Sequence, residues 1–214
     1  MIEFKNHLYS GFETLNIKIS DDQIELMAVH AKELMFWNQK INITAINNPL
    51  QIAEKHFMDS IAAASFIKNK SCLLDLGSGG GFPGIPIKII NPLLNVVLID
   101  ASLKKINFLK HVIRRLGLKG IKAVNARVQD LQGKTDYKTR FDAVISRAFT
   151  NLSDFSELAS PFLNRTGTIY AMKGKNAEKE MTHEVMEKFN VKKEYYQLPF
   201  EKSDRYVITL DRRI

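Results

Sequence analysis

The first 70 residues carry apolar side chains at helical spacing. A capping-box pattern starts at Ser20, with a glutamine three positions later and a run of helically spaced apolar residues beyond it. A second start signal at Asn48, followed by proline, predicts a helix over residues 49–66. Residues 37–44 between them are rich in Asn and Thr, which favour a turn. We therefore expect an N-terminal helical extension over residues 1–70.

After residue 70, short aliphatic runs alternate with helical patterns. The predicted strands are Cys72–Leu76, Val96–Asp100, Ile121–Asn125, Phe141–Ser146 and Thr168–Met172. The predicted helices are Ser102–Leu116, Leu152–Leu163 and Ala177–Phe189, and a closing hairpin is predicted from Tyr195–Leu198 and Arg205–Leu210. Alternating strands and helices of these lengths are typical of an α/β fold, in which helices cover both faces of a mostly parallel sheet.

A glycine-rich loop follows the first predicted strand. Residues 75–84 read Asp-Leu-Gly-Ser-Gly-Gly-Gly-Phe-Pro-Gly, and a helix is predicted to follow them. Ligands of open parallel sheets bind at the carboxyl ends of the strands, where this loop falls. Glycines let the backbone approach a ligand closely, whereas so many of them in a loop without a ligand would cost chain entropy without return. We therefore expect the loop to bind a ligand.

Two kinds of nucleotide cofactor match parts of this loop. Gly79, Gly81 and Gly84 have the spacing of a dinucleotide-binding fingerprint, but the match starts three residues beyond the strand. The frame of Asp75, Gly77, Gly79 and Gly81 resembles motif I of the class I S-adenosylmethionine (SAM) methyltransferases. A carboxylate at Asp75 would repel a pyrophosphate and attract the ammonium and sulfonium of SAM. No Gly-Lys-Ser/Thr follows, which excludes a phosphate-binding P-loop.

Two further strand ends suit a nucleoside. The second strand ends at Asp100, whose carboxylate can accept hydrogen bonds from both ribose hydroxyls. NAD enzymes also bind the ribose through a carboxylate at this position, so Asp100 does not distinguish NAD from SAM. The alternative role of Asp100 is to cap the next helix. In the methyltransferase fold that the loop resembles, the turn after the third strand borders the adenine. The resemblance therefore implies that Val128 packs on the adenine ring and that Gln129 meets its edge, and the alternative is a helix start.

The positive charge of the chain is local. The 214 residues have a formal net charge of +8, and residues 101–147 hold 12 basic and 3 acidic side chains. The segments on either side are close to neutral. A basic block of this kind indicates a polyanionic partner such as RNA or DNA, the alternative being a solvated helix face.

The composition excludes several classes of protein. Hydrophobic residues make up 45% and charged residues 25%, as in ordinary globular proteins. The longest apolar stretch is far shorter than the ~20 residues that a bilayer span needs, and the chain does not open with a signal-peptide pattern. One cysteine excludes an internal disulfide and a cysteine-based metal cluster, and the five histidines are scattered. We expect a cytoplasmic, monomeric protein without a metal or a membrane partner.

Five short motifs occur in the order of one known family. They are Trp37-Asn38 with Asn42-Ile43-Thr44, His56-x-x-Asp59-Ser60, the glycine segment 79–84, Ser146-Arg147-Ala148-Phe149, and Tyr170-Ala171-Met172-Lys173-Gly174. Together they resemble the RsmG (GidB) family of bacterial small-subunit ribosomal RNA methyltransferases, from about residue 20 to the C-terminus. The resemblance implies a class I SAM-dependent methyltransferase (Rossmann-like) core with a seven-stranded sheet at residues 71–214. It also implies SAM as cofactor, 16S ribosomal RNA or the small ribosomal subunit as partner, and methylation of N7 of a guanine in the 530 loop.

The resemblance assigns roles to individual residues. It places cofactor contacts at Gly77, Phe82, Val128, Gln129 and Arg147, to which the loop and strand-end arguments add Asp75, Gly79 and Asp100. For RNA contact we expect Arg147, Phe149 and Lys173, with core packing as the alternative for Phe149 and a solvated loop position as the alternative for Lys173. The pair His56 and Asp59 is expected to shape the cofactor pocket or to tie the N-terminal helices to the sheet.

The absent motifs agree with methylation at a ring nitrogen. Enzymes that methylate exocyclic amines commonly carry Asn/Asp-Pro-Pro-Tyr/Phe after the fourth strand, where this chain reads Ser-Arg-Ala-Phe. Cys72 opens a buried strand, a poor place for the nucleophile that pyrimidine C5 methylation requires. Guanine N7 has an exposed lone pair and no proton to lose, so alignment of the reactants can suffice. We therefore predict no catalytic acid or base.

The sequence also leaves open a NAD-type oxidoreductase, based on the glycine segment 79–84 and Asp100, and a non-catalytic RNA-binding or ribosome-assembly protein on a methyltransferase scaffold.

Overall fold

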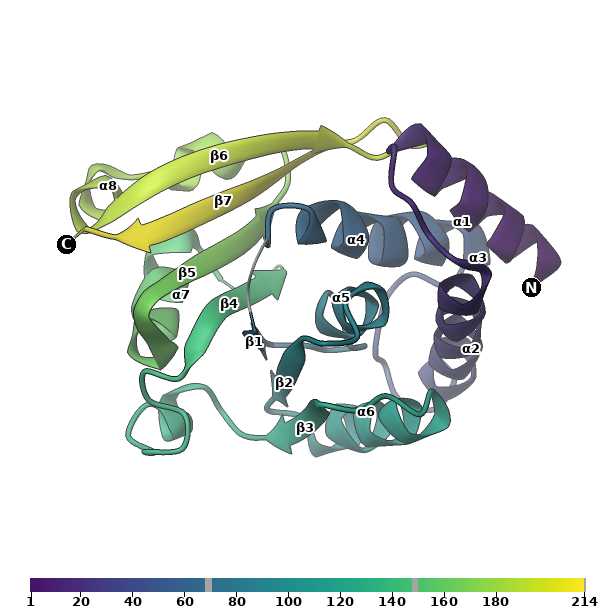
Figure 1. The fold of residues 1–214 in the computed structure, drawn as a ribbon, viewed down its shortest axis with the longest axis horizontal. Helices are drawn as coiled ribbons and strands as arrows, with labels where there is room; N and C mark the ends of the chain where they lie inside the picture. The colour runs from purple at the N-terminus through teal and green to yellow at the C-terminus, as the bar shows by residue number, and fades with distance from the viewer. Residues whose placement is uncertain (68–70, 148–149, 214) are drawn as a thin grey trace.

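The aliphatic runs after residue 70 form a seven-stranded sheet in the described part of the chain (Figure 1). The structure is a computed structural model that describes residues 1–67, 71–147 and 150–213. The strand order is β3-β2-β1-β4-β5-β7-β6, with β7 antiparallel to both of its neighbours and the other pairs parallel. The strands are β1 (Cys72–Leu76), β2 (Asn95–Asp100), β3 (Ile121–Asn125), β4 (Phe141–Arg147), β5 (Leu163–Lys173), β6 (Phe189–Gln197) and β7 (Asp204–Arg212). The predicted α/β class and the mostly parallel sheet are confirmed.

The helices cover both faces of this sheet. Successive residues of the central strands alternate between two apolar cores, so that Leu73 joins one core and Leu74 the other. The first core also contains side chains of α5 (Gly84–Ile90) and α6 (Leu103–Arg115), and the second contains side chains of α7 (Leu152–Ala159). The order β1–α5–β2–α6–β3 brings the carboxyl ends of the parallel strands to one edge, where the predicted site residues lie.

The predicted helix Ala177–Phe189 is wrong in its extent. The chain forms a short 3-10 helix at Ala177–Glu180 and then α8 (His183–Lys188). Thr182 has an extended backbone (φ −70°, ψ 162°), which separates the two helices. Phe189 pairs with Arg212 in the β6–β7 ladder, so pairing with the last strand overrides the local helical pattern. The hairpin strands are accordingly longer than predicted.

The N-terminal helices share a core with the sheet. They are α1 (Ile2–Thr14), α2 (Asp21–Asn38), α3 (Pro49–Ile52), a π-helix (Ala53–Met58) and α4 (Asp59–Ala64). Ser20 caps α2 as predicted, with its side chain accepting from the Gln23 N–H at 3.3 Å and the Gln23 side chain accepting from the Ser20 N–H at 3.0 Å. The predicted helix at residues 49–66 forms, but the π-helix within it was not foreseen. The division at residue 70 stays a prediction, since residues on both sides of it contribute to one apolar core.

None of the helices in the described residues is both long enough and apolar enough to cross a bilayer.

Candidate active site

The glycine loop takes a backbone conformation that favours glycine. Gly77, Gly79 and Gly81 have positive φ angles of 75°, 55° and 90°. The N–H groups of Gly77 and Ser78 both donate to the carbonyl of Ile99, at 2.8 and 2.9 Å. The loop is therefore fixed against the end of β2.

A cavity of about 400 Å³ opens beside this loop at the ends of β2 and β3. Its lining comprises Gly77, Ile99, Asp100, Ala101, Ala126, Arg127, Val128 and Gln129. Asp100 accepts one hydrogen bond on each carboxylate oxygen, from the Gly79 N–H at 3.0 Å and from the Ser102 N–H at 2.8 Å. A carboxylate has about four acceptor positions, so Asp100 keeps capacity for two more donors. Four of the predicted cofactor residues thus line one cavity of a size and polarity that suit a nucleoside.

Asp75 lies beneath the loop. Its side chain is fully buried, and its Oδ2 accepts from the Gly84 N–H at 2.9 Å. Its Oδ1 has no hydrogen-bond partner among the described residues. Burial raises the pKa of Asp75 to about 7, against the opposing effects of the hydrogen bonds from Gly84 and Ser78. Asp75 therefore supports the loop from below and does not line the cavity.

Phe82 lies within a stack of ring systems behind the loop. Its ring is stacked on His30, with 4.9 Å between centroids, and on His56, with 4.6 Å. The guanidinium carbon of Arg147 lies 5.3 Å from the Phe82 centroid. Phe82 is buried and does not line the cavity beside the loop, so it orders side chains that reach the site.

Arg147, at the end of β4, is held by the π-helix. Its Nη2 donates to His56 Nδ1 at 2.9 Å, and its Nη1 donates to the Lys55 carbonyl at 2.7 Å. A π-helix frequently marks a functional site, because its wider turn redirects side chains. Here it turns the Lys55 carbonyl and the His56 ring toward β4.

Both buried histidines are neutral. Burial and the Arg147 charge lower the pKa of His56 to about 3, and burial lowers the pKa of His30 to about 4. Since His56 Nδ1 accepts from Arg147, its Nε2 carries the proton and donates to Thr44 Oγ1 at 2.9 Å. Both ring nitrogens of His56 are therefore engaged. His30 Nε2 donates to the Gly80 carbonyl at 2.8 Å, so His30 links α2 to the glycine loop.

A second cavity of about 420 Å³ lies where β4 and β5 end. It is lined by Ile46, Lys55, His56, Asp59, Arg147, Met172, Lys173, Gly174 and Arg205. Asp59 lies 3.4 Å from Arg147 and 3.4 Å from Arg205, and it accepts from the Tyr196 hydroxyl at 2.8 Å. Lys173 donates to the Thr150 carbonyl at 2.6 Å and pairs with Glu180 at 2.6 Å. The lining holds four cations and one carboxylate, a composition that suits an anionic ligand.

The two cavities separate the predicted residues into two groups. Gly77, Asp100, Val128 and Gln129 line the first, and Arg147 and Lys173 line the second. Phe149 lies outside the described residues. From the sequence, His56 and Asp59 are predicted only as a pair, and Lys55, Tyr196 and Arg205 are not predicted. Tyr196 and Arg205 come from the C-terminal hairpin, and no local motif marks them.

No group of three or more His, Cys, Asp or Glu side chains that could hold a metal ion occurs in the residues described.

The fold and the site define a class I SAM-dependent methyltransferase. The required parts are a glycine loop after β1, a carboxylate at the end of β2 and an apolar turn after β3. A predicted O-methyltransferase from Agrobacterium tumefaciens superposes with a TM-score of 0.62, at 17% identity over 73% of this chain and 81% of that chain. TrmK from M. capricolum, in complex with S-adenosyl-homocysteine, superposes with a TM-score of 0.57, at 13% identity over 72% of this chain and 67% of that chain.

Sequence comparison identifies the particular family. The family model described as rRNA small subunit methyltransferase G matches residues 23–208. The protein named ribosomal RNA small subunit methyltransferase G from Geobacter sulfurreducens is 38% identical over 95% of each chain. The protein of the same name from Geobacter metallireducens is 38% identical over 99% of this chain and 97% of its own. The chain belongs to the rRNA small subunit methyltransferase G family, which confirms the predicted family, fold and SAM cofactor. The comparisons favour neither the NAD-type oxidoreductase nor the non-catalytic RNA-binding protein.

Proposed function

We propose that this chain transfers the methyl group of SAM to N7 of a guanine in the 530 loop of 16S ribosomal RNA. The observation that carries the proposal is the pair of cavities at one edge of the sheet, one suited to a nucleoside and one rich in cations. The names of the relatives support the RNA substrate. A bacterial ribosomal RNA substrate implies a cytoplasmic location, and the proposed enzyme acts as a monomer.

The first cavity has the groups that SAM requires. When bound, SAM supplies an electrophilic methyl group on a sulfonium. The free acceptor positions of Asp100 suit the ribose hydroxyls, Val128 supplies an apolar surface for adenine, and Gln129 supplies amide groups for the adenine edge. Asp75 lies beneath the loop and contributes to SAM binding indirectly, because it accepts a hydrogen bond from the Gly84 N–H and so holds the loop in place.

The second cavity suits a guanine and its phosphate. Arg147 and Lys173 provide N–H donors for guanine O6 and for a phosphate oxygen, which leaves N7 facing the methyl group. Attack by the N7 lone pair releases no proton, so the reaction requires no general base. This suits a cavity in which both nitrogens of His56 and both oxygens of Asp59 are engaged. The catalytic contribution of the chain is then alignment of the nucleophile, methyl group and sulfur.

Methyl transfer from labelled SAM to small-subunit RNA, followed by nucleoside analysis, tests the proposal. We expect label in 7-methylguanosine of 16S ribosomal RNA, with naked RNA and intact small subunits compared as substrates. Label in another nucleoside would refute the N7 assignment and leave the methyltransferase activity. Lack of label in RNA, with SAM still bound by the protein, would refute the RNA substrate.

A further inference from the structure

A third cavity lies at the opposite edge of the sheet. Its volume is about 480 Å³, and its lining includes the first residues of four strands: Cys72 of β1, Asn95 of β2, Ile121 of β3 and Phe141 of β4. Since these neighbouring strands are parallel, their first residues lie on the edge away from the glycine loop. Strands of five to seven residues separate the two edges by roughly 17–23 Å. The cavity is therefore distinct from the two that form the active site.

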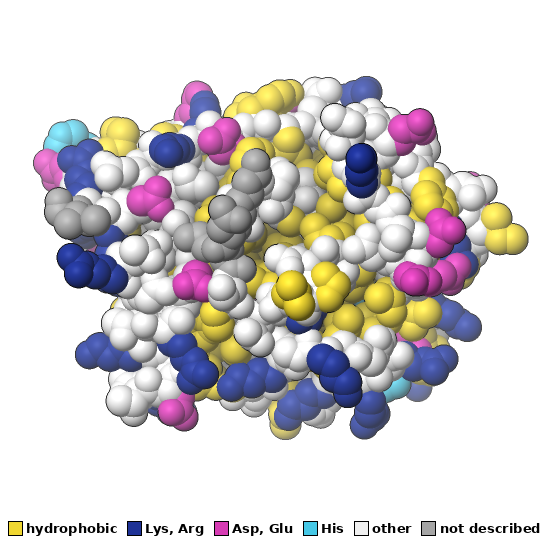
Figure 2. All heavy atoms as spheres, viewed as in Figure 1, with side chains coloured by type: hydrophobic (Ala, Val, Ile, Leu, Met, Phe, Trp, Pro, Cys, Tyr) yellow, Lys and Arg dark blue, Asp and Glu magenta, His cyan; other side chains and the backbone are white. Residues whose placement is uncertain are grey.

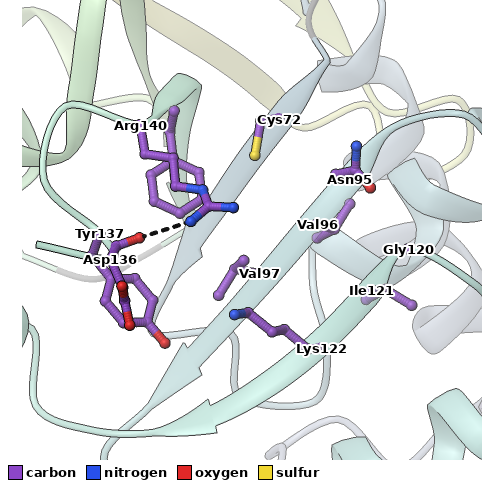
Figure 3. Close-up of a pocket in the computed structure, with 11 residues that line it drawn as sticks. Cys72, Asn95, Val96, Val97, Gly120, Ile121, Lys122, Asp136, Tyr137 and Arg140 are labelled. Carbon is purple, nitrogen blue, oxygen red and sulfur yellow. Dashed lines mark hydrogen bonds between the residues drawn. The ribbon is translucent and has the colours of Figure 1, made fainter.

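Two cations reach into this cavity from two sides (Figure 3). Lys122 extends from β3, and Arg140 extends from the segment before β4. Arg140 donates to the Asp136 carbonyl at 3.3 Å, and the Lys122 ammonium lies 5.6 Å from the centroid of the Tyr137 ring. Neither cation forms an ion pair with a carboxylate of the described residues. Both charges are therefore available to an anion.

The lining also holds the Asn95 amide and one carboxylate, Asp136, and most of its other side chains are apolar or aromatic. Val97 and Ile121 form part of the floor, and the half-buried Tyr137 ring forms part of the wall. An apolar floor, an aromatic ring and two cations together match a nucleotide, because a base binds apolar and aromatic surfaces while its phosphate binds cations. On the face shown in Figure 2, Lys and Arg side chains gather along the lower rim, over α6 and β3. This charge favours a polyanion over a neutral ligand.

We propose that this cavity binds an unpaired nucleotide of the RNA substrate, at a distance from the methylated guanine. The proposal rests on the proposed function, which supplies RNA as the partner. The base lies on the apolar floor beside Tyr137, and its phosphate lies between Lys122 and Arg140. Contact at both edges of the sheet orients a structured RNA on the enzyme before a guanine enters the active site.

The lone cysteine of the chain provides a direct probe, because Cys72 lines this cavity. The alkylation rate of Cys72 with a neutral maleimide is measured with 16S ribosomal RNA, with small-subunit ribosomal proteins free of RNA, with free guanosine monophosphate and with SAM. We expect RNA to slow alkylation severalfold, and we expect SAM alone to leave the rate unchanged. Slowing by the mononucleotide but not by RNA would overturn the proposal in favour of a soluble nucleotide. Slowing only by small-subunit proteins would overturn it in favour of a protein partner.

The double variant Lys122→Gln with Arg140→Gln tests the cations. We expect RNA protection of Cys72 to be lost, and the slope of log affinity against log salt concentration to fall in magnitude by about 1.4, the value for two single-strand phosphate contacts. The matched control is Lys18→Gln with Lys192→Gln, which removes two exposed lysines outside this cavity. Equal protection in the two double variants would overturn the proposal.

Tyr137 is tested by a conservative and a disruptive change. Tyr137→Phe keeps the ring and should keep RNA affinity, whereas Tyr137→Leu should weaken it about tenfold, as loss of one stacked base does. Thermal unfolding of Tyr137→Leu checks that the fold persists. Neither RNA affinity nor the protection of Cys72 depends on methyltransferase activity. If Cys72 is protected but 7-methylguanosine is absent, the proposed function fails and this site stands. If 7-methylguanosine forms without protection, only this site fails.

Discussion

At the scale of single residues, the backbone conformation of the glycine loop determines which residues the loop can contain. Gly77 has a φ of 75°, so any side chain there strains the backbone at the wall of the cavity that we propose for SAM. A carboxylate at this position would also lie at the same cavity as Asp100. Conformation and charge therefore both favour glycine.

We expect Gly77→Asp to weaken SAM binding at least about tenfold, as measured by isothermal titration calorimetry. This corresponds to about 1.4 kcal/mol or more of lost binding free energy. Gly117→Asp is the matched control, because Gly117 also has a positive φ, of 63°, but has open space around it. If both variants lost SAM affinity equally, the loss would come from general instability, and the assignment of the cavity would lack support.

His30 gives a pH dependence that is opposite in sign to that of a buried carboxylic acid. Its folded-state pKa of about 4 lies below the unfolded value of 6.5, because burial disfavours the charged ring. The unfolded state therefore takes up a proton first, and the stability contributed by the neutral ring is lost as the pH falls from 6.5 toward 4. Asp75, with its pKa raised to about 7, acts in the other direction over much of this range.

His30→Gln isolates the contribution of this histidine. Glutamine keeps an N–H donor for the Gly80 carbonyl but does not titrate. We expect the wild type to lose about 1.4 kcal/mol more than His30→Gln in free energy of unfolding between pH 7.5 and 5.5, as measured by urea denaturation. Equal losses in the two proteins would mean that His30 already has a normal pKa.

At the scale of helices and strands, local sequence signals predict where a helix starts better than where it ends. The capping box at Ser20 and the cap at Asn48 were predicted and form, because both depend only on residues within one turn. The π-helix at Ala53–Met58 and the strand start at Phe189 depend on packing and on pairing with β7, which no window of the sequence contains. The same distinction holds at the site, where the glycine loop was predictable but Tyr196 and Arg205 were not.

The cap of α2 contributes a measurable amount to the free energy of unfolding. Ser20→Ala removes the acceptor of the Gln23 N–H, and we expect a loss of about 1 kcal/mol in free energy of unfolding. Ser10→Ala is the control, because Ser10 lies exposed within α1, where alanine has the higher helix propensity. Chemical denaturation of both variants provides the measurement. A loss as large for Ser10→Ala would contradict the assigned cap.

At the scale of the whole molecule, Asp59 connects three distant parts of the chain. It belongs to α4, lies near Arg147 at the end of β4, and accepts a hydrogen bond from Tyr196 of the C-terminal hairpin. From the sequence, Asp59 is predicted to act with His56, either by shaping the cofactor pocket or by tying the N-terminal helices to the sheet. In the structure it lines the cation-rich cavity and also makes this tie.

Two adjacent tyrosines allow the stability contributed by this long-range hydrogen bond to be compared with that of a local one. Tyr196 donates to Asp59 at 2.8 Å across 137 residues, where Asp59 is 4% exposed. Tyr195 donates to Asp204 at 2.9 Å across 9 residues, on a side chain that is 54% exposed. We expect Tyr196→Phe to lower the free energy of unfolding by about 2 kcal/mol, as for a buried hydrogen bond to a charged group. Tyr195→Phe should cost less than about 0.5 kcal/mol, because water replaces the lost partner.

In an Asp59→Asn background the loss of unfolding free energy caused by Tyr196→Phe should shrink toward about 1 kcal/mol, since a neutral acceptor forms a weaker hydrogen bond. An unchanged loss in that background would show that the Tyr196 hydroxyl stabilises the hairpin independently of the Asp59 carboxylate, and that the tie between the N-terminal helices and the hairpin lies elsewhere.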